Sequence, residues 1–236
     1  MHVEKRCPYV TKADPSSSHG VILACVQDLP AGTRILDVGA ATGILGELLR
    51  GKGFALYGIE PSPRWAEAAR KHYQELMCCS LEQAPDPFLS GYDVAICADV
   101  LEHMPDPRSA LQRLTSLQPM GCKFIVSVPN VANLWVRLNL LLGRFPYAER
   151  GILDSTHLRF FTRDSLLAMV RSVGLKVGRT IATPIPLGLI YPSLPRTAWG
   201  RAVCAGVAFL TNLWPTLLGY QFIVQAVKSS PEGDAT

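Results

Sequence analysis

Charged residues are scarce in this sequence: they make up 18% of its 236 residues, whereas hydrophobic residues make up 48%. So low a charge content excludes a disordered chain and a coiled coil. The 19 glycines and 18 prolines follow no internal repeat, which excludes a collagen-like fibre. The length is enough for one sizeable domain with at most a small appendage.

A strong excess of one charge is also missing. The 23 basic and 19 acidic residues leave a net charge of +4, which is too weak to indicate a nucleic-acid partner. The charge is unevenly placed, because residues 131–201 carry 10 basic and 3 acidic residues. This basic segment is either a solvated arginine-rich surface or a site for an anionic partner, such as a phosphate-bearing substrate or a membrane surface.

Cysteines with metal-ligand spacing are absent. The seven cysteines form no CxxC pair, and the adjacent Cys78 and Cys79 have no histidine or cysteine partner at a zinc-like spacing. We therefore expect no metal site, and free thiols in a reducing cytoplasm. The N-terminal stretch lacks the apolar core of a signal peptide, which agrees with a cytoplasmic protein.

Continuous apolar segments of strand type alternate with helical patterns along the chain. Such a pattern indicates a parallel sheet with helices on both faces, that is, a doubly wound α/β domain. We place this domain at 16–228, between a flexible arm, 1–15, and a disordered tail, 229–236. The strands are expected at 33–38, 54–60, 75–79, 92–98, 122–129, 175–183 and 220–228, and the main helices at 18–29, 43–53, 63–73, 106–117 and 163–174.

A glycine-rich turn, ILDVGAATG at 35–43, follows the first of these strands. Gly39 and Gly43 permit a tight turn and a close approach of the backbone to a ligand. The spacing does not meet the GxGxxG pattern of nicotinamide-binding enzymes, which disfavours an oxidoreductase. Glu60 ends the second strand, at the sheet edge where ligands bind in open parallel sheets, and its carboxylate can accept both hydroxyls of a ribose.

These motifs resemble the class I S-adenosylmethionine-dependent methyltransferases. ILDVGAATG is similar to the first motif of that family, YGIEPS to the second, and YDVAICADVLEHMPDP to the segment around the fourth strand. The resemblance covers about residues 30–180. It implies a Rossmann-like fold with a mostly parallel, seven-stranded sheet, S-adenosylmethionine as the cofactor, and methyl transfer as the activity.

The resemblance also implies the cofactor-binding residues. Asp37 and Gly39 would lie by the methionine part, Glu60 would bind the ribose, and Ser80 or the Leu81 amide would meet the adenine. Ala41 stands where many members have a second glycine, and Ser80 stands where many have an aspartate. The full expected set is Asp37, Gly39, Ala41, Gly43, Glu60, Ser80, Leu81, Asp99, Val100, Leu101 and Glu102.

A closer resemblance lies in GILDSTHLRFFT, at 151–162. It is similar to a bacterial methyltransferase subfamily linked to sugar, lipid and quinone modification, and to the methionine-biosynthesis W protein. The first likeness implies methylation of an oxygen on a small-molecule or glycolipid-type acceptor. The second leaves open a non-catalytic accessory protein that binds S-adenosylmethionine and regulates a partner enzyme.

Oxygen methylation calls for a general base within hydrogen-bond reach of the acceptor. We predict that His157 is this base and that Asp154, three residues earlier, fixes its tautomer. The alternative is that both side chains only tie down their loop. His103, beside the expected cofactor pocket, is the second candidate. Arg159 would clamp an anionic acceptor or remain a surface charge.

Two apolar insertions, 131–162 and 184–219, are expected to form a lid over the acceptor. Residues 202–227 carry no charge, so a membrane-spanning helix, a packed helix followed by a strand, and a lid that touches lipid all remain open. A homodimer interface would explain the apolar residues equally well. The predicted partners are a small-molecule or lipid-linked acceptor and no nucleic acid, with peripheral membrane contact and a homodimer left open.

Overall fold

The computed structural model describes residues 15–229 and contains a seven-stranded sheet in the order β3-β2-β1-β4-β5-β7-β6. β7 pairs antiparallel with both β5 and β6, whereas the remaining pairs are parallel, so the predicted mostly parallel sheet is confirmed. The strands are β1 Arg34–Val38, β2 Ala55–Ile59, β3 Glu75–Met77, β4 Val94–Ala98, β5 Lys123–Pro129, β6 Leu175–Thr183 and β7 Gln221–Lys228.

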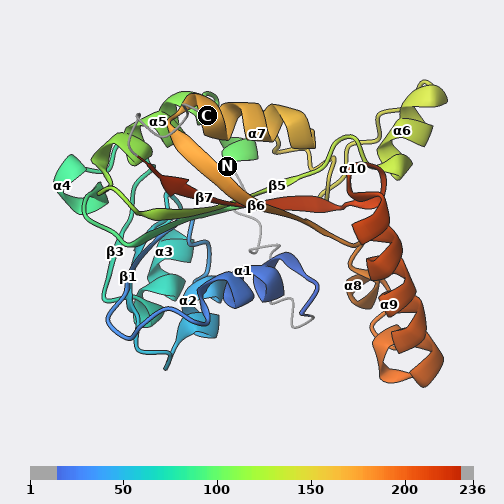
Figure 1. Cartoon of the computed structure of the whole chain (residues 1–236), viewed down its shortest axis with the longest axis horizontal. Coiled ribbons are helices and arrows are strands. Elements are labelled where there is room, and N and C mark those ends of the chain that lie inside the picture. Colours follow the sequence, from blue (N-terminus) through green and yellow to red (C-terminus); the bar gives the residue numbers. More distant parts are fainter. Residues whose placement is uncertain (1–14, 230–236) are drawn as a thin grey trace.

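Helices cover both faces of the sheet (Figure 1). α1 Ser18–Val26, α2 Ile44–Leu49 and α3 Pro63–Ala69 pack on one face. α4 Asp86–Leu89, α5 Pro107–Leu117 and α7 Arg163–Ser172 pack on the other. Because both faces are covered, the central strands are buried on both sides, which explains their continuous apolar sequences. The remaining elements are α6 Leu134–Leu141, α8 Leu187–Ile190, α9 Ala198–Leu213, α10 Pro215–Leu218, and the short 3-10 helices η1 Arg70–His72, η2 Leu101–His103 and η3 Leu194–Arg196.

The strand order reverses between β1 and β4, and this reversal creates a crevice at their carboxyl ends. β1 pairs with β2 on one side and with β4 on the other, so the chain leaves β1 and β4 in opposite directions across the sheet. Ligands of doubly wound folds bind at such a switch point. The glycine-rich turn follows β1, and η2 follows β4, so both expected binding segments lie at this crevice.

The uncharged segment 202–227 is divided between a helix and a strand. α9 ends at Leu213, the short α10 follows, and β7 begins at Gln221. Within residues 15–229, none of the helices has the length and apolar character needed to cross a membrane. Of the three alternatives, the structure shows a helix followed by a strand, but this helix packs little: its buried residues are Gly200 and Thr211. Figure 1 shows α9 and α6 at one end of the molecule, away from the main layers.

The predicted arm and tail fall on residues outside the described range, apart from residues 15 and 229.

Asn130, at the end of β5, joins the two apolar insertions. Its side chain is fully buried, and its Nδ2 donates to the carbonyls of Thr216 (3.1 Å) and Gly219 (2.9 Å). Its Oδ1 accepts from the amide of Ala132 at 3.0 Å. The neighbouring Asn133 donates to the same Gly219 carbonyl at 2.9 Å. The start of α6 is therefore fastened to the turn between α10 and β7.

We expect Asn130→Ala to lower the free energy of unfolding by about 2 kcal/mol, because it removes the three hydrogen bonds of a buried side chain, two to carbonyls and one from the Ala132 amide. Urea denaturation checks this value. Asn139→Ala is the matched control, because Asn139 makes its side-chain hydrogen bond, to the Trp135 carbonyl, at an exposed position. Equal effects of the two substitutions would contradict the role given to Asn130.

Candidate active site

The glycine-rich turn lies tightly against the loop that follows β4. The amides of Gly39 and Ala40 both donate to the carbonyl of Ile59, at 2.9 Å each, which ties the turn to the end of β2. Gly39 has a φ of +80°, and a Cβ built there would lie 2.7 Å from Cγ2 of Val100. Glycine is therefore required at position 39 for two reasons: backbone conformation and the close approach of Val100.

Glu60 lies beside this turn and is almost fully buried. Its Oε2 accepts from the amide of Ala41 and its Oε1 from the amide of Ser62, both at 2.8 Å. Burial raises the pKa of this carboxyl, and the two amide contacts work in the opposite direction. Each carboxylate oxygen can accept a further hydrogen bond, so the amides orient Glu60 without using up its acceptor capacity.

Strained backbone marks the two loops on either side of the crevice. Among residues 15–229, Ala41 (φ 46°) and Asp99 (φ 54°) are the non-glycine residues with positive φ. Ala41 is in the turn after β1, and Asp99 directly follows β4. A left-handed conformation is unfavourable for a residue with a Cβ and persists where the surrounding structure holds it. The strain therefore points to the same crevice as the glycine-rich turn.

Asp99 connects three strands at their ends. The hydroxyl of Ser127, on β5, donates to its Oδ1 at 2.6 Å, and the Nε2 of Gln221, on β7, donates to its Oδ2 at 2.7 Å. Sequence analysis overlooked both partners. Gln221 is 122 residues from Asp99. Their contact depends on β7 lying next to β5, which no local sequence pattern predicts.

Asp37 is buried beneath the turn. The hydroxyl of Tyr73 donates to its Oδ2 at 2.5 Å, and the same hydroxyl accepts from the amide of Gly46 at 3.2 Å. Burial raises the pKa of Asp37 to about 6. Tyr73 is a second partner that sequence analysis overlooked. Through it, Asp37 links β1 to the first turn of α2.

Gly43, Leu101, Ser80 and Leu81 complete the predicted cofactor set. Gly43, with a φ of +84°, caps α2 and packs against Ala69. Leu101, the first residue of η2, is fully buried. The Ser80 amide approaches the Oε1 of Gln83 at 3.4 Å, at the end of a loop after β3. Leu81 lines a surface cavity together with Pro105, Asp106, Ser109 and Arg113.

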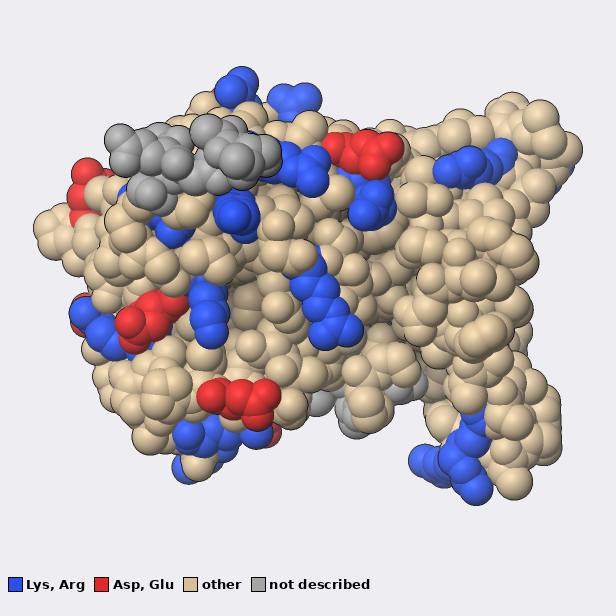
Figure 2. Space-filling model, in the orientation of Figure 1, with Lys and Arg blue, Asp and Glu red and all other residues tan. Residues whose placement is uncertain are grey.

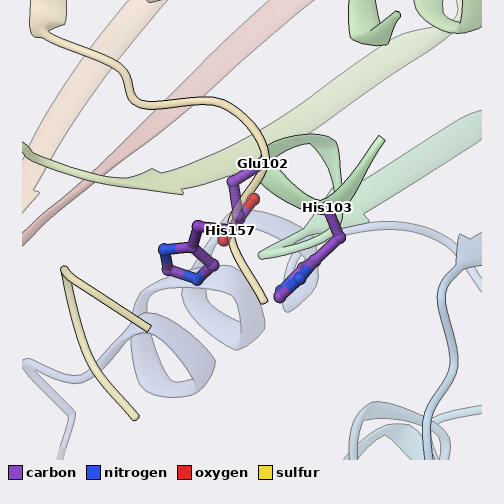
Figure 3. Close-up of side chains that lie close together, drawn as sticks. All are labelled: Glu102, His103 and His157. Carbon is purple, nitrogen blue, oxygen red and sulfur yellow. The ribbon is translucent and has the colours of Figure 1, made fainter. Parts of the chain in front are cut away.

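Glu102, His103 and His157 form a cluster at the crevice (Figure 3). The first two belong to η2, and His157 belongs to the loop at 151–162. The Glu102 carbonyl accepts from the amides of Leu158 (2.8 Å) and Arg159 (3.0 Å), which joins the two segments. The imidazole rings are 4.8 Å apart in an edge-on arrangement. One ligand-type atom from each of the three side chains lies within 4.8 Å of the others.

His157 has a defined hydrogen-bonding state. Its Nδ1–H donates to the carbonyl of Ile152 at 3.1 Å, which leaves Nε2 as the acceptor of the neutral ring. Burial lowers the pKa of His157, and the adjacent His103 lowers it further. His103 lies with Nδ1 3.2 Å from both oxygens of Thr156. His157 is therefore held as a neutral ring with a proton-accepting nitrogen.

The carboxylate of Asp154 turns to Thr156 and not to the ring of His157. Its Oδ1 accepts from the amide (2.8 Å) and the hydroxyl (2.7 Å) of Thr156. An aspartate side chain readily accepts a hydrogen bond from the backbone amide two residues ahead, and Asp154 forms this local turn in place of a hydrogen bond to the His157 ring. The prediction that Asp154 fixes the tautomer of His157 is therefore wrong: the Ile152 carbonyl does so.

Arg159 and the adjacent aromatic pair anchor the same loop. The Arg159 guanidinium donates to the Pro105 carbonyl through Nε (2.9 Å) and Nη2 (2.5 Å), which holds the segment after η2 and the loop together. Phe161 is buried, and Phe160 packs edge-on against Phe145 with ring centres 5.5 Å apart. The loop that carries His157 is thus built into the fold.

A doubly wound sheet with a glycine-rich turn and an acidic residue after β2 defines a nucleotide-type cofactor site. Residues 17–179 match the family described as a methyltransferase domain. The chain therefore belongs to this family, and within it to the class I S-adenosylmethionine-dependent methyltransferases.

Curated relatives include ubiquinone biosynthesis O-methyltransferases. The one from Aeromonas salmonicida is 32% identical over 158 residues, which span 62% of this chain and 64% of the relative. The one from Thiobacillus denitrificans is 31% identical over 171 residues, which span 68% and 72% of the two chains. Sequence similarity to the first relative thus extends over less than two thirds of its length.

Solved structures with the same fold include enzymes of different activity. The magnesium protoporphyrin IX methyltransferase from Synechocystis PCC 6803 with bound SAH has a TM-score of 0.58 and 20% identity, covering 89% of this chain and 80% of that one. The [4+2]-cyclase SpnF has a TM-score of 0.60 and 18% identity, covering 96% and 86%. The likeness establishes the fold, and the side chains at the site must carry the argument about chemistry.

Proposed function

We propose that this protein transfers the methyl group of S-adenosylmethionine to an oxygen of a small-molecule acceptor and that His157 accepts the proton. The observation that carries the proposal is the Nε2 of a neutral His157 at the crevice, next to η2. The names of the curated relatives support an oxygen acceptor.

The residues at the crevice fit the cofactor. Gly39 has no side chain, so the turn from Asp37 to Gly43 leaves room for a ligand there. Each carboxylate oxygen of Glu60 accepts one amide and can accept one further hydrogen bond, which would come from a ribose hydroxyl. Asp99, Val100, Leu101 and Glu102 would line the pocket on the other side of the turn. Ser80 and the Leu81 amide would meet the adenine.

When bound, the cofactor would supply a methyl group on a sulfonium, and its transfer would break the S–CH3 bond as the O–CH3 bond formed. His157 removes the hydroxyl proton at Nε2 as the acceptor oxygen becomes positively charged. The Ile152 carbonyl holds the ring in the required tautomer and steadies the positive charge that develops on it. Burial, together with the adjacent His103, lowers the pKa of His157 and so disfavours protonation of the resting ring. Positioning of the two reactants supplies much of the remaining acceleration.

The test is methyl transfer by the purified full chain. Methyl-labelled S-adenosylmethionine is incubated with quinone precursors, sugar nucleotides and lipid extracts, and we expect label in one organic product whose new bond is an O–CH3 ether. A protein that binds the cofactor but methylates none of these acceptors would support the non-catalytic accessory role. If EDTA abolishes turnover and a divalent cation restores it, the cluster of Glu102, His103 and His157 is a metal site and not a proton acceptor.

A further inference from the structure

α9 exposes a continuous apolar stripe to solvent. Trp199, Val203, Leu210 and Leu213 follow one another at helical spacing, and their exposed fractions range from 40% to 65%. Phe209, at the edge of the stripe, is 67% exposed. The buried residues of the helix, Gly200 and Thr211, lie outside this stripe. This helix is therefore apolar on the side that faces away from the protein. A helix that packs on a domain in water normally has polar residues on that side.

α6 adds a second group of exposed apolar side chains at the same end of the molecule. Trp135 (49%), Leu138 (50%), Leu141 (81%) and Leu142 (68%) are exposed there. Asn130 and Asn133 fasten the start of α6 to the turn after α10, so the two insertions are held together. We call the exposed side chains of α6 and α9 the projecting apolar surface.

The charges around this surface are mostly basic. Residues 131–150 and 184–219 contain five arginines, Arg137, Arg144, Arg150, Arg196 and Arg201, and a single acidic residue, Glu149. Figure 2 shows the end of the molecule formed by α6 and α9 as largely uncharged, with basic and no acidic side chains on the visible face. The exposed Trp199 and Trp214 also flank α9 at its two ends. Apolar side chains combined with arginine and tryptophan are characteristic of segments that lie in a membrane interface.

A second copy of the chain is a poorer occupant of this surface. In a symmetric dimer each surface would meet its own copy, and the arginines would mostly face arginines, because these segments carry five arginines and one glutamate. The match to the methyltransferase family ends at residue 179, before α9 begins. Membership of the family therefore does not explain the exposed apolar stripe of α9.

We propose that the projecting apolar surface docks on an anionic phospholipid bilayer, with α9 lying in the plane of the interface. This inference does not depend on the proposed function, because binding to lipid requires no turnover. It would nevertheless serve that function. Val136 of α6 packs with Ile152 and Leu153, in the loop that carries His157. A docked surface would thus bring the acceptor side of the crevice close to the membrane.

The test uses the full chain and vesicles of phosphatidylcholine with or without phosphatidylglycerol. We expect sedimentation with the anionic vesicles alone, a blue shift of tryptophan emission on binding, and release at high salt. The double variant Phe209→Ser/Leu213→Ser and the double variant Arg196→Gln/Arg201→Gln should each weaken binding by about 10-fold or more. Met120→Ser is the matched control, because Met120 is 54% exposed in the turn before β5, away from this surface.

Equal binding to neutral vesicles, or equal binding by the control and the α9 variants, would overturn the proposal. A different result would also overturn it. If the wild-type protein does not bind anionic vesicles and elutes from a sizing column as a dimer, and Phe209→Ser/Leu213→Ser elutes as a monomer, a second copy of the chain occupies the surface. All substituted side chains are exposed, and circular dichroism verifies that the variants are folded.

Discussion

We expect His157→Ala to lower turnover by about 100-fold or more, while the affinity for S-adenosylmethionine stays near that of the parent protein. The reason is that the substitution removes the Nε2 acceptor of a ring whose other nitrogen is already engaged by the Ile152 carbonyl. Single-turnover kinetics measures the first quantity, and calorimetry with the demethylated cofactor measures the second. The two readouts separate a base from a residue that only shapes the crevice.

The pH profile gives a second readout of the same residue. His157 is active in its neutral form, and its pKa is lowered from 6.5 by burial and by His103. Turnover should therefore stay at its plateau as the pH falls through 6.5 and should decline only at a lower pH. His103→Ala removes one cause of the lowered pKa, so the acid limb should move upward while turnover falls less than in His157→Ala.

Two results would count against this role. If His157→Ala retains full turnover, the ring is structural, and His103 becomes the candidate base. If turnover, cofactor binding and thermal stability all collapse together, the substitution has damaged the loop at 151–162. Thr156→Val is a useful comparison, because it disturbs the hydrogen bonds of the Asp154 turn and leaves the His157 ring in place.

We expect Glu60→Ala to weaken the binding of S-adenosylmethionine by about 100-fold or more, because charge-assisted hydrogen bonds contribute about 1.5–3 kcal/mol each. The substitution removes the acceptor proposed for two ribose hydroxyls and also leaves the amides of Ala41 and Ser62 without their carboxylate. Calorimetry measures the affinity, and thermal unfolding without ligand reports the cost to the turn itself.

Glu67→Ala is the matched control for this experiment. Glu67 lies in the helix that follows Glu60, its side chain is 81% exposed, and it pairs with Arg70 on the surface. Its loss should leave cofactor affinity unchanged. If Glu60→Ala binds the cofactor as tightly as the parent protein, the carboxylate orients the turn and does not hold the ribose. If the parent protein itself does not bind, the proposed function fails as a whole.

The secondary structure was largely predictable because it is encoded locally. Strands buried on both faces need continuous apolar residues, so β1, β4 and β5 are visible as such in the sequence. The helices of the main layers begin at capping residues such as Asp106 and Thr162, whose side chains bond the first turn of α5 and α7. The short α4 was not predicted, since four residues carry no helical period.

The cofactor side of the candidate site was also accessible from the sequence. Gly39 and Glu60 are far apart in the chain, but each directly follows a buried strand, and the ends of parallel strands meet at one edge of the sheet. The catalytic side was not accessible in the same way. Asp154 precedes His157 by three residues, yet its carboxylate bonds Thr156, and the ring bonds Ile152. Spacing alone does not distinguish between local partners that lie equally close.

Sequence by itself determined which segments are buried, where the backbone must turn tightly, and the family to which the chain belongs. Only the tertiary structure decided that β7 lies between β5 and β6, which brings Gln221 to Asp99 across 122 residues. It also decided that α9 turns an apolar face outward. The physical reason is the same in both cases. Composition and hydrophobic periodicity report how apolar a segment is, whereas the elements that pack next to it depend on the strand order of the sheet.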